Sequence, residues 1–391
     1  MFPLLPLPPS VIATAGAVAL SALAVTLYDP RLWRSRWFRY TSAAAFAPAA
    51  LGLGLWHFGS LPLAGLGVRL VWTTLPVLGL VAVTALVVAV IRRALEWLGR
   101  LGPRRGEKSA RAGARREFLR SAAGLLPLGA GLVGASAMSR NDPTQIVHVP
   151  LTFADLPEAL HGLRILQLSD LHLGASRTAN DLREVLEALR SNPPDLIVLT
   201  GDVADHLGEL EKGLALVTAF APRLGVYAAL GNHEYLNDIR QTLPIYEQSP
   251  VTLLVNQTAS VPVGDASLFI AGVDDPVFIG PPRGFFEKAI AACAESAPRN
   301  DSFRLLLCHR PEGFEAAARH GFHLTLSGHT HGAQVGIFGR SIVEVLFGIP
   351  YWWGKYQRGQ SRLYTTSGFG HWFPFRLNCP AEAPIIELRR A

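Results

Sequence analysis

Five short segments in the C-terminal half of the chain contain side chains that could bind metal ions or transfer protons. In an extended segment, residues i and i+2 point to the same side. Asp170 with His172, and His329 with His331, can therefore each present two ligands to one cavity. The full set of candidates is Asp170, His172, Asp202, Asn232, His233, His309, His329 and His331.

Each segment follows a short apolar run that is typical of a buried β-strand. Taken singly, a Gly-Asp pair usually forms a turn, and a histidine beside an apolar strand is more often a core residue than a ligand. The five segments together argue against coincidence, because loops at strand ends are where α/β folds build their sites. We predict the strands at 164–168, 196–200, 226–230, 305–308 and 324–327.

Amphipathic stretches between these strands predict helices. Thr178 can cap a helix with Leu182 and Leu186 on one face, and Leu210 and Leu214 mark a second helix. Strands that alternate with helices in this way predict a layered α/β domain, which we place at residues 141–391.

The five segments read, in order, D-L-H at 170–172, G-D at 201–202, G-N-H-E at 231–234, H at 309 and G-H-T-H-G at 328–332. This order resembles the calcineurin-like metallophosphoesterases, and the resemblance spans about residues 160–335. It implies a four-layer αββα sandwich. The chain looks similar to a bacterial membrane-associated branch with UDP-2,3-diacylglucosamine diphosphatase relatives. Three segments carry this finer likeness, Val273-Asp274-Asp275-Pro276, Gly328-His329-Thr330-His331-Gly332 and Leu377-Asn378-Cys379-Pro380. Arg310 and Ala333 depart from it.

The resemblance also implies a dinuclear metal site. Asp202 would bridge the two ions, and a metal-bridging hydroxide would attack phosphorus, with His233 as the proton donor and Glu234 orienting a neighbour. Carboxylate, imidazole and amide ligands without thiolate suit manganese, iron or zinc. By resemblance, Asp170, His172, Asp202 and His331 hold one ion, and Asp202, Asn232, His309 and His329 hold the other.

Charge divides the sequence into two chemically different halves. Residues 1–140 contain 16 Lys and Arg against 4 Asp and Glu, whereas residues 141–391 contain 20 against 26. The basic residues lie between apolar runs and not on the predicted folded domain, so nucleic-acid binding is not expected. The three cysteines have no CxxC spacing, which predicts buried thiols and neither a disulfide scaffold nor a thiolate zinc site.

Four uncharged runs in residues 1–140 predict about four transmembrane helices, although a buried core helix is the alternative for any one of them. The basic loops at 31–39 and 92–120 favour the cytoplasmic side, which places the domain from residue 141 outside the cytoplasm. We therefore expect a multi-pass protein of a bacterial cell membrane, with the lipid bilayer as a partner. The runs are Ser10–Tyr28, Thr41–Phe58, Leu70–Ile91 and Ser121–Ser139.

The stretch Arg115-Arg116-Glu117-Phe118-Leu119-Arg120 resembles a twin-arginine export signal, which would make the export machinery a second partner. The small residues Ala135-Ser136-Ala137 fit a cleavage site, and the sequence leaves open whether the last run is removed.

The substrate is the least determined property. Aromatic residues are dense from Val335 to Phe375, including Trp352 and Trp353, and they could contact lipid or pack a second sheet. A phosphodiester or diphosphate on a lipid suits an enzyme close to a membrane. The precursor used by the resembled branch is made on the cytoplasmic face, however, and this conflicts with the predicted orientation. The alternatives are a phosphomonoesterase or nucleotide phosphodiesterase with a soluble substrate, and an inactive membrane sensor.

Overall fold

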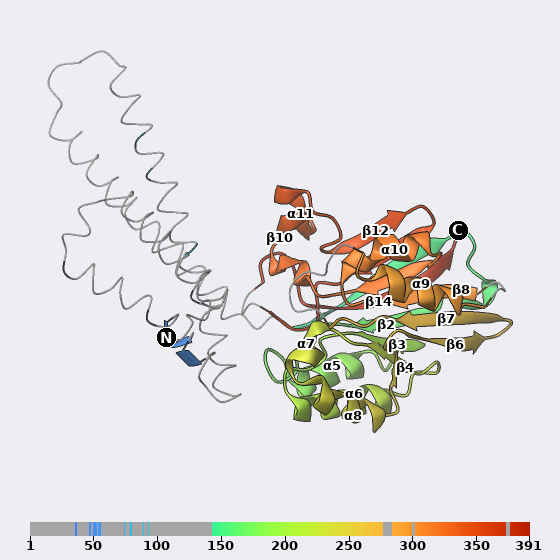
Figure 1. Cartoon of the computed structure of the whole chain (residues 1–391), viewed down its shortest axis with the longest axis horizontal. Helices are drawn as coiled ribbons and strands as arrows, with labels where there is room; N and C mark the ends of the chain where they lie inside the picture. The colour runs from blue at the N-terminus through green and yellow to red at the C-terminus, as the bar shows by residue number, and fades with distance from the viewer. Residues whose placement is uncertain are drawn as a thin grey trace, which may run out of the picture. The chain divides into compact units, whose positions relative to one another are not determined.

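The computed structural model describes residues 143–276, 284–298, 302–372 and 376–391, together with single positions between 36 and 93. The chain separates into two units, residues 1–141 with 373–375 and residues 142–372 with 376–391. The second unit contains every candidate site residue and is drawn in colour in Figure 1.

The four predicted membrane helices lie outside the described residues, apart from a few single positions in the second and third runs. Among the residues that the structure describes, no helix combines the length and apolar character needed to cross a bilayer. The twin-arginine-like stretch at 115–120 also lies outside them.

The first six-stranded sheet combines strands from both ends of the second unit. Its order is β1-β14-β2-β3-β4-β5. Neighbouring strands are parallel except for β14 and β2, which run antiparallel. The strands are β1 (Gln145–Phe153), β14 (Glu382–Arg390), β2 (Arg164–Leu168), β3 (Leu196–Thr200), β4 (Val226–Ala229) and β5 (Thr252–Leu253).

The second six-stranded sheet has the order β12-β13-β9-β8-β7-β6. Its four inner strands are parallel, and the edge strands β12 and β6 are antiparallel to their neighbours. The strands are β12 (Gly354–Arg358), β13 (Ser361–Thr365), β9 (Leu324–Ser327), β8 (Ser302–Leu307), β7 (Ala266–Gly272) and β6 (Gln257–Val263).

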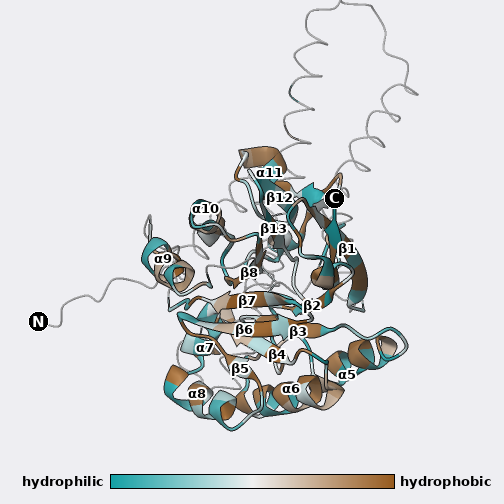
Figure 2. Ribbon diagram, turned by 90° about the vertical axis from the view of Figure 1, so that its right-hand side faces the viewer, coloured by the Kyte–Doolittle hydropathy of each residue, from teal (hydrophilic) through white to brown (hydrophobic). Residues whose placement is uncertain are grey.

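The two sheets pack face to face and are covered by helices on their outer faces (Figures 1 and 2). One apolar cluster, with Ile165 and Leu305, fills the space between the sheets. Separate clusters attach α5, α6 and α8 to the first sheet, and α9 and α10 to the second. This is the predicted αββα order of layers. The covering helices are α5 (Ala179–Ala188), α6 (Leu207–Phe220), α8 (Ile239–Glu247), α9 (Glu287–Glu295) and α10 (Phe314–Arg319).

The predicted strands at 164–168, 196–200 and 324–327 coincide with β2, β3 and β9. Thr178 caps α5 through a reciprocal capping box with Asp181, as the sequence indicated. The predictions for β4 and β8 differ from the structure by one to three residues at their ends. All three cysteines are free and buried, as expected.

Shorter elements lie around the ends of the strands. The helix α7 follows β4, and a small module of β10, β11 and α11 follows β9. Their bounds are η2 (Glu158–Leu160), α7 (Asn232–Leu236), η3 (Pro311–Gly313), η4 (His331–Gln334), β10 (Gly336–Ile337), β11 (Arg340–Ser341) and α11 (Ile342–Phe347).

Candidate metal centre

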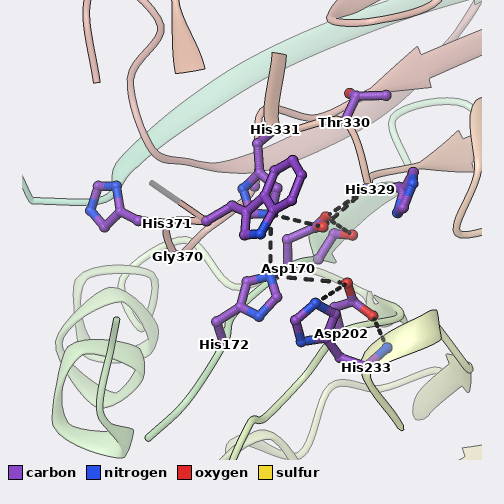
Figure 3. Close-up of polar contacts among 12 residues, drawn as sticks. Asp170, His172, Asp202, His233, His329, Thr330, His331, Gly370 and His371 are labelled. Atoms are coloured by element: carbon purple, nitrogen blue, oxygen red, sulfur yellow. Dashed lines mark hydrogen bonds and ion pairs between the residues drawn. The ribbon is translucent and has the colours of Figure 1, made fainter. Parts of the chain in front are cut away.

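The predicted site residues lie where five parallel strands end, three in the first sheet and two in the second. Figure 3 shows that Asp170, His172, Asp202, His233, His329 and His331 gather in one place. Because both sheets direct the carboxyl ends of these strands to the same region, the sandwich brings together residues that are up to 161 positions apart in sequence. Asp170 and His172 follow β2, Asp202 follows β3, Asn232 and His233 begin α7 after β4, His309 follows β8, and His329 and His331 follow β9.

The first cluster of possible ligands consists of Asp170, His172 and His331, all buried. The Nε2 atom of His331 lies 3.3 Å from Oδ1 of Asp170 and 3.1 Å from Nε2 of His172. When both rings are neutral, each has only one N–H. A cation that binds both Nε2 atoms satisfies two buried lone pairs at once.

The second cluster consists of Asp202, His309 and His329. Asn232 begins α7, directly before His233, whose backbone N–H donates to Asp202. The Nδ1 atom of His309 lies 2.7 Å from the backbone oxygen of Thr200, so Nδ1 is its donor and Nε2 has the free lone pair. Among the described residues, neither Nε2 of His309 nor Oδ1 of Asn232 has a hydrogen-bond partner. Buried polar atoms of this kind fit a divalent cation.

Asp202 lies between the two clusters. Its Oδ2 atom is 3.2 Å from Nε2 of His309 and 4.0 Å from Nε2 of His172. Its other oxygen, Oδ1, accepts a hydrogen bond of 2.9 Å from the backbone N–H of His233. This position fits the bridging role that the sequence resemblance implied.

The backbone at the site is held in an uncommon conformation. Positive φ angles occur at five of the candidate ligands, at values from 47° to 66°. Outside glycine such angles are uncommon, and they cluster at functional sites where the surrounding structure fixes them. The five residues are Asp170, His172, Asp202, His329 and His331.

Two glycines allow the loops to approach one another. Gly201 has a φ of +88°, and a Cβ atom there would lie 2.7 Å from the backbone of Gly231. A Cβ atom on Gly328 would lie 2.0 Å from Oδ2 of Asp170 and 2.1 Å from Oγ of Ser169. Neither position has room for a side chain.

Opposing effects set the ionisation of the site. Burial raises the pKa of Asp202, but the imidazoles of His309, His233 and His172 outweigh it and hold this pKa well below its usual value. Burial and neighbouring positive charge lower the pKa of His329 and His331 well below the usual value. Burial lowers the pKa of His309 and His172, but Asp202 and Asp205 outweigh it, and the pKa of His309 is raised to about 10. These two imidazoles must therefore release a proton when a cation binds, because neutral imidazoles and ionised carboxylates are the forms that bind metal ions.

Glu234 fixes the loops that hold Asp202. Its buried carboxylate accepts hydrogen bonds from the backbone N–H groups of Asp202 at 3.0 Å, Val203 at 2.8 Å and Gly231 at 2.7 Å. These contacts agree with the orienting role expected from the sequence.

Asp205 is a site residue that the sequence reasoning missed. Its two oxygens lie 3.0 Å from Nδ1 of His172 and 2.6 Å from Nδ1 of His233, so one carboxylate orients a candidate ligand and the candidate proton donor. Burial lowers the pKa of His233, but Asp202 and Asp205 outweigh it and raise this pKa to about 10. The sequence contains one signal that could have indicated its role, since Asp205 is a second carboxylate three residues after Asp202 in the same loop.

A buried ion pair lies behind the second cluster. The guanidinium of Arg310 donates from Nε to both oxygens of Asp275, at 2.9 Å and 2.8 Å, and its Nη1 lies 2.7 Å from Nε2 of His329. Arg310 is one of the two departures from the resembled pattern. Its partner Asp275 belongs to the segment 273–276 that carried the finer likeness.

Residues 163–333 match the family model described as calcineurin-like phosphoesterase. This region is a calcineurin-like metallophosphoesterase domain. The Asp and His clusters at its strand ends fit two divalent cations.

Relatives with the same kind of domain occur in animals and bacteria. A protein of Danio rerio described as a transmembrane protein with metallophosphoesterase domain is 31% identical over 67% of this chain and 60% of its own length. An uncharacterised metallophosphoesterase of Campylobacter jejuni is 30% identical over 64% of this chain and 66% of its own length. The metallophosphoesterase YkuE of Bacillus subtilis is 29% identical over 70% of this chain and 97% of its own length. The chain thus spans less than two thirds of the first two relatives.

Replacement of Gly328 with alanine should disrupt the first cluster, because the added methyl group would collide with Asp170 and Ser169. We expect the Gly328→Ala chain to retain its secondary structure and to bind less metal, as measured by elemental analysis after dialysis. Gly208→Ala is the matched control, since a Cβ atom there meets nothing closer than 3.6 Å. Equal metal content in the two variants would contradict this account of the loop.

Replacement of Asp205 with asparagine should weaken metal binding by about 10–100-fold, the usual effect of removing a group that orients a ligand. A carboxylate can accept hydrogen bonds from both imidazole Nδ1 atoms, whereas an amide must turn its NH₂ group toward one of them. Competition titration with a chelator measures the affinity. The carboxylate of Asp238, which is 34% exposed and pairs with Arg240, provides the control variant Asp238→Asn.

Proposed function

We propose that this chain is a membrane-anchored, dinuclear metal-dependent phosphoesterase that hydrolyses a phosphodiester or diphosphate bond. The observation that carries the proposal is the position of Asp202, a buried carboxylate that belongs to one cluster of candidate ligands and also approaches His172 of the other. Such a pair of sites is typical of enzymes that displace a leaving group at phosphorus.

Each side chain has a distinct task in this proposal. Two divalent cations, when bound, lower the pKa of a shared water molecule and offset charge on the phosphoryl oxygens. Asp170, His172, Asp202 and His331 would hold one cation, and Asp202, Asn232, His309 and His329 the other. Glu234 and Asp205 keep these ligands in place through the contacts described above.

His233 is the candidate proton donor. Its side chain is 23% exposed, in contrast to the nearly inaccessible imidazoles of His172 and His309, so it can meet a substrate. Asp205 accepts from Nδ1, which leaves Nε2 to give its proton to the leaving oxygen. The same protonated ring would offset negative charge on that oxygen.

A lipid-linked substrate is the proposed class. The uncharged runs between residues 10 and 139 support a membrane location, and so do relatives in Danio rerio and Bos taurus that are described as transmembrane proteins. We further propose export by the twin-arginine route and an extracytoplasmic domain, from the loop charges and residues 115–120. The proposal of a UDP-2,3-diacylglucosamine diphosphatase-like branch rests on segments 273–276, 328–332 and 377–380. Its cytoplasmic substrate cannot be reconciled with this orientation.

Two other classes of function would use the same fold. A phosphomonoesterase or nucleotide phosphodiesterase with a soluble substrate needs the same ligands, and a substrate panel with several divalent metals separates it from a lipid phosphoesterase. An inactive membrane sensor is disfavoured by the complete set of seven candidate ligands. Absence of metal-dependent hydrolysis across the panel would favour the sensor.

The Asp202→Asn variant should fold, lose nearly all hydrolysis and bind less metal, because an amide lacks the charge that balances two cations. Hydrolysis of a nitrophenyl phosphodiester and elemental analysis measure the two effects. Near-normal turnover with both metals retained would show that Asp202 is not the bridge.

The His233→Ala variant should keep its metals and lose about 10²–10⁴ in rate, the usual contribution of a positioned proton donor. The loss should be smaller for a nitrophenolate leaving group, which departs without a proton, than for an alkoxide. A loss of equal size for both leaving groups would remove His233 from the role of proton donor.

The topology is tested with reporters fused after residue 105 and after residue 145. We expect a cytoplasmic signal from the first and an extracytoplasmic signal from the second, because basic loops stay in the cytoplasm. The paired change Arg115→Lys and Arg116→Lys keeps the charge of the loop. Loss of export in that variant would implicate the twin-arginine route, and the reverse pattern of reporter signals would refute the proposed orientation.

A further inference from the structure

The helix α11 has the reverse of the usual arrangement for a surface helix. Its one charged residue, Glu344, is buried, whereas Val345, Leu346 and Phe347 are exposed. A helix on the surface of a soluble domain normally directs its apolar stripe to the core and its charged residues to water. Figure 2 shows α11 at the periphery of the second unit, coloured largely brown for apolar residues.

Contacts of Glu344 hold the helix in this orientation. One carboxylate oxygen accepts hydrogen bonds from the backbone N–H of Trp352 at 2.8 Å and from the hydroxyl of Tyr356, and the other lies 3.2 Å from Nε of Arg340. The hydroxyl of Ser341, the N-cap of α11, donates to the backbone oxygen of Gly332 at 2.9 Å. The apolar side chains therefore face outward because polar groups fix the opposite side.

The exposed apolar residues form a surface that we call the α11 patch. Phe338, at the tip of the turn between β10 and β11, is 99% exposed, and Phe347 is 71% exposed. Large apolar residues that are exposed close to one another often mark a site of interaction with a protein or a membrane. The patch consists of Phe338, Val345, Leu346, Phe347 and Ile349.

Basic residues outnumber acidic ones in the sequence around the α11 patch. Between residues 335 and 380 the sequence contains five Lys and Arg and a single carboxylate, the buried Glu344. Arg340, Lys355 and Arg358 are exposed; Arg340 pairs with Glu344, and Arg358 pairs with Glu315 of α10. Apolar side chains flanked by exposed cations suit the interface of a bilayer that contains anionic lipid.

The length of the connection to the last uncharged run also bears on where the domain can lie. The last uncharged run ends at Ser139, and the described domain begins at residue 143. Even fully extended, so short a connection spans only about 3.3–3.6 Å per residue. If that run lies in the bilayer, the domain is confined near the lipid headgroups.

We propose that the α11 patch docks the catalytic domain onto the surface of an anionic bilayer, with Phe338, Leu346 and Phe347 inserted at the interface. The docked module is joined to the candidate metal centre, since η4 begins at His331 and leads directly into β10. Docking would thus set the orientation of the site toward lipid-linked phosphate. The inference rests on the proposed membrane location but not on the proposed hydrolysis.

The full chain reconstituted into vesicles tests the proposal. Because all three native cysteines are buried, Phe338→Cys can be labelled selectively with bimane. We expect phosphatidylcholine brominated on its acyl chains, mixed with phosphatidylglycerol, to quench this label. A label at Ser191→Cys, an exposed turn after α5, is the matched control and should not be quenched. High salt or omission of phosphatidylglycerol should reduce the quenching at position 338.

Changing Leu346→Glu and Phe347→Glu together should abolish the quenching and leave hydrolysis of a small nitrophenyl phosphodiester unchanged. If that double variant does not fold, the comparison of labels at 338 and 191 still decides the question. An unquenched label at 338 in chains that float with vesicles would overturn the proposal, as would efficient cross-linking between Cys-substituted 338 positions of two copies. Failure of the chain to float would refute the membrane location and docking together, whereas quenching without hydrolysis would refute only the phosphoesterase activity.

Discussion

A buried negative charge at Asp202 is the constraint on which this domain depends. A carboxylate removed from water is costly unless positive groups or hydrogen-bond donors compensate it. Here the compensation comes from histidines on both sheets and from the backbone N–H of His233. Because those histidines follow strands of different sheets, the site can form only when the two sheets are packed face to face.

A layer of supporting acids keeps that arrangement in place. Glu234 ties the loop after β3 to the loop after β4, Asp205 holds two imidazoles, and Asp275 anchors Arg310 beside His329. Each of these three carboxylates accepts hydrogen bonds from specific backbone or side-chain N–H groups. These contacts orient the candidate ligands, which is the usual role of the groups that lie behind the ligands of a metal site.

A buried acid also fixes the module of β10, β11 and α11 that follows β9. Glu344 is satisfied by the Trp352 backbone, Tyr356 and Arg340, and this fixes an apolar helix with its side chains outward. The exposure of the α11 patch therefore follows from specific hydrogen bonds on the opposite side of the helix. Its connection to the loop of His329 and His331 joins the proposed lipid contact to the proposed chemistry.

The sequence by itself determined the candidate ligands and the principal strands of a layered α/β domain, because each depends on a local pattern of apolar runs that end in metal-binding residues. The four-layer αββα order was implied by the resemblance of these segments to a known family. The position of β14 between β1 and β2 was evident only in the tertiary structure, since the pairing of segments more than 200 residues apart leaves no local signal in the sequence. Asp205 and the Arg310–Asp275 pair were missed for the same reason, as a carboxylate's partners are set by packing. The aromatic stretch was undecided in the sequence, and the fold divides it: Phe369 is fully buried, whereas Phe338 is almost fully exposed. Composition cannot make that distinction, because burial depends on which face of each element the rest of the chain covers.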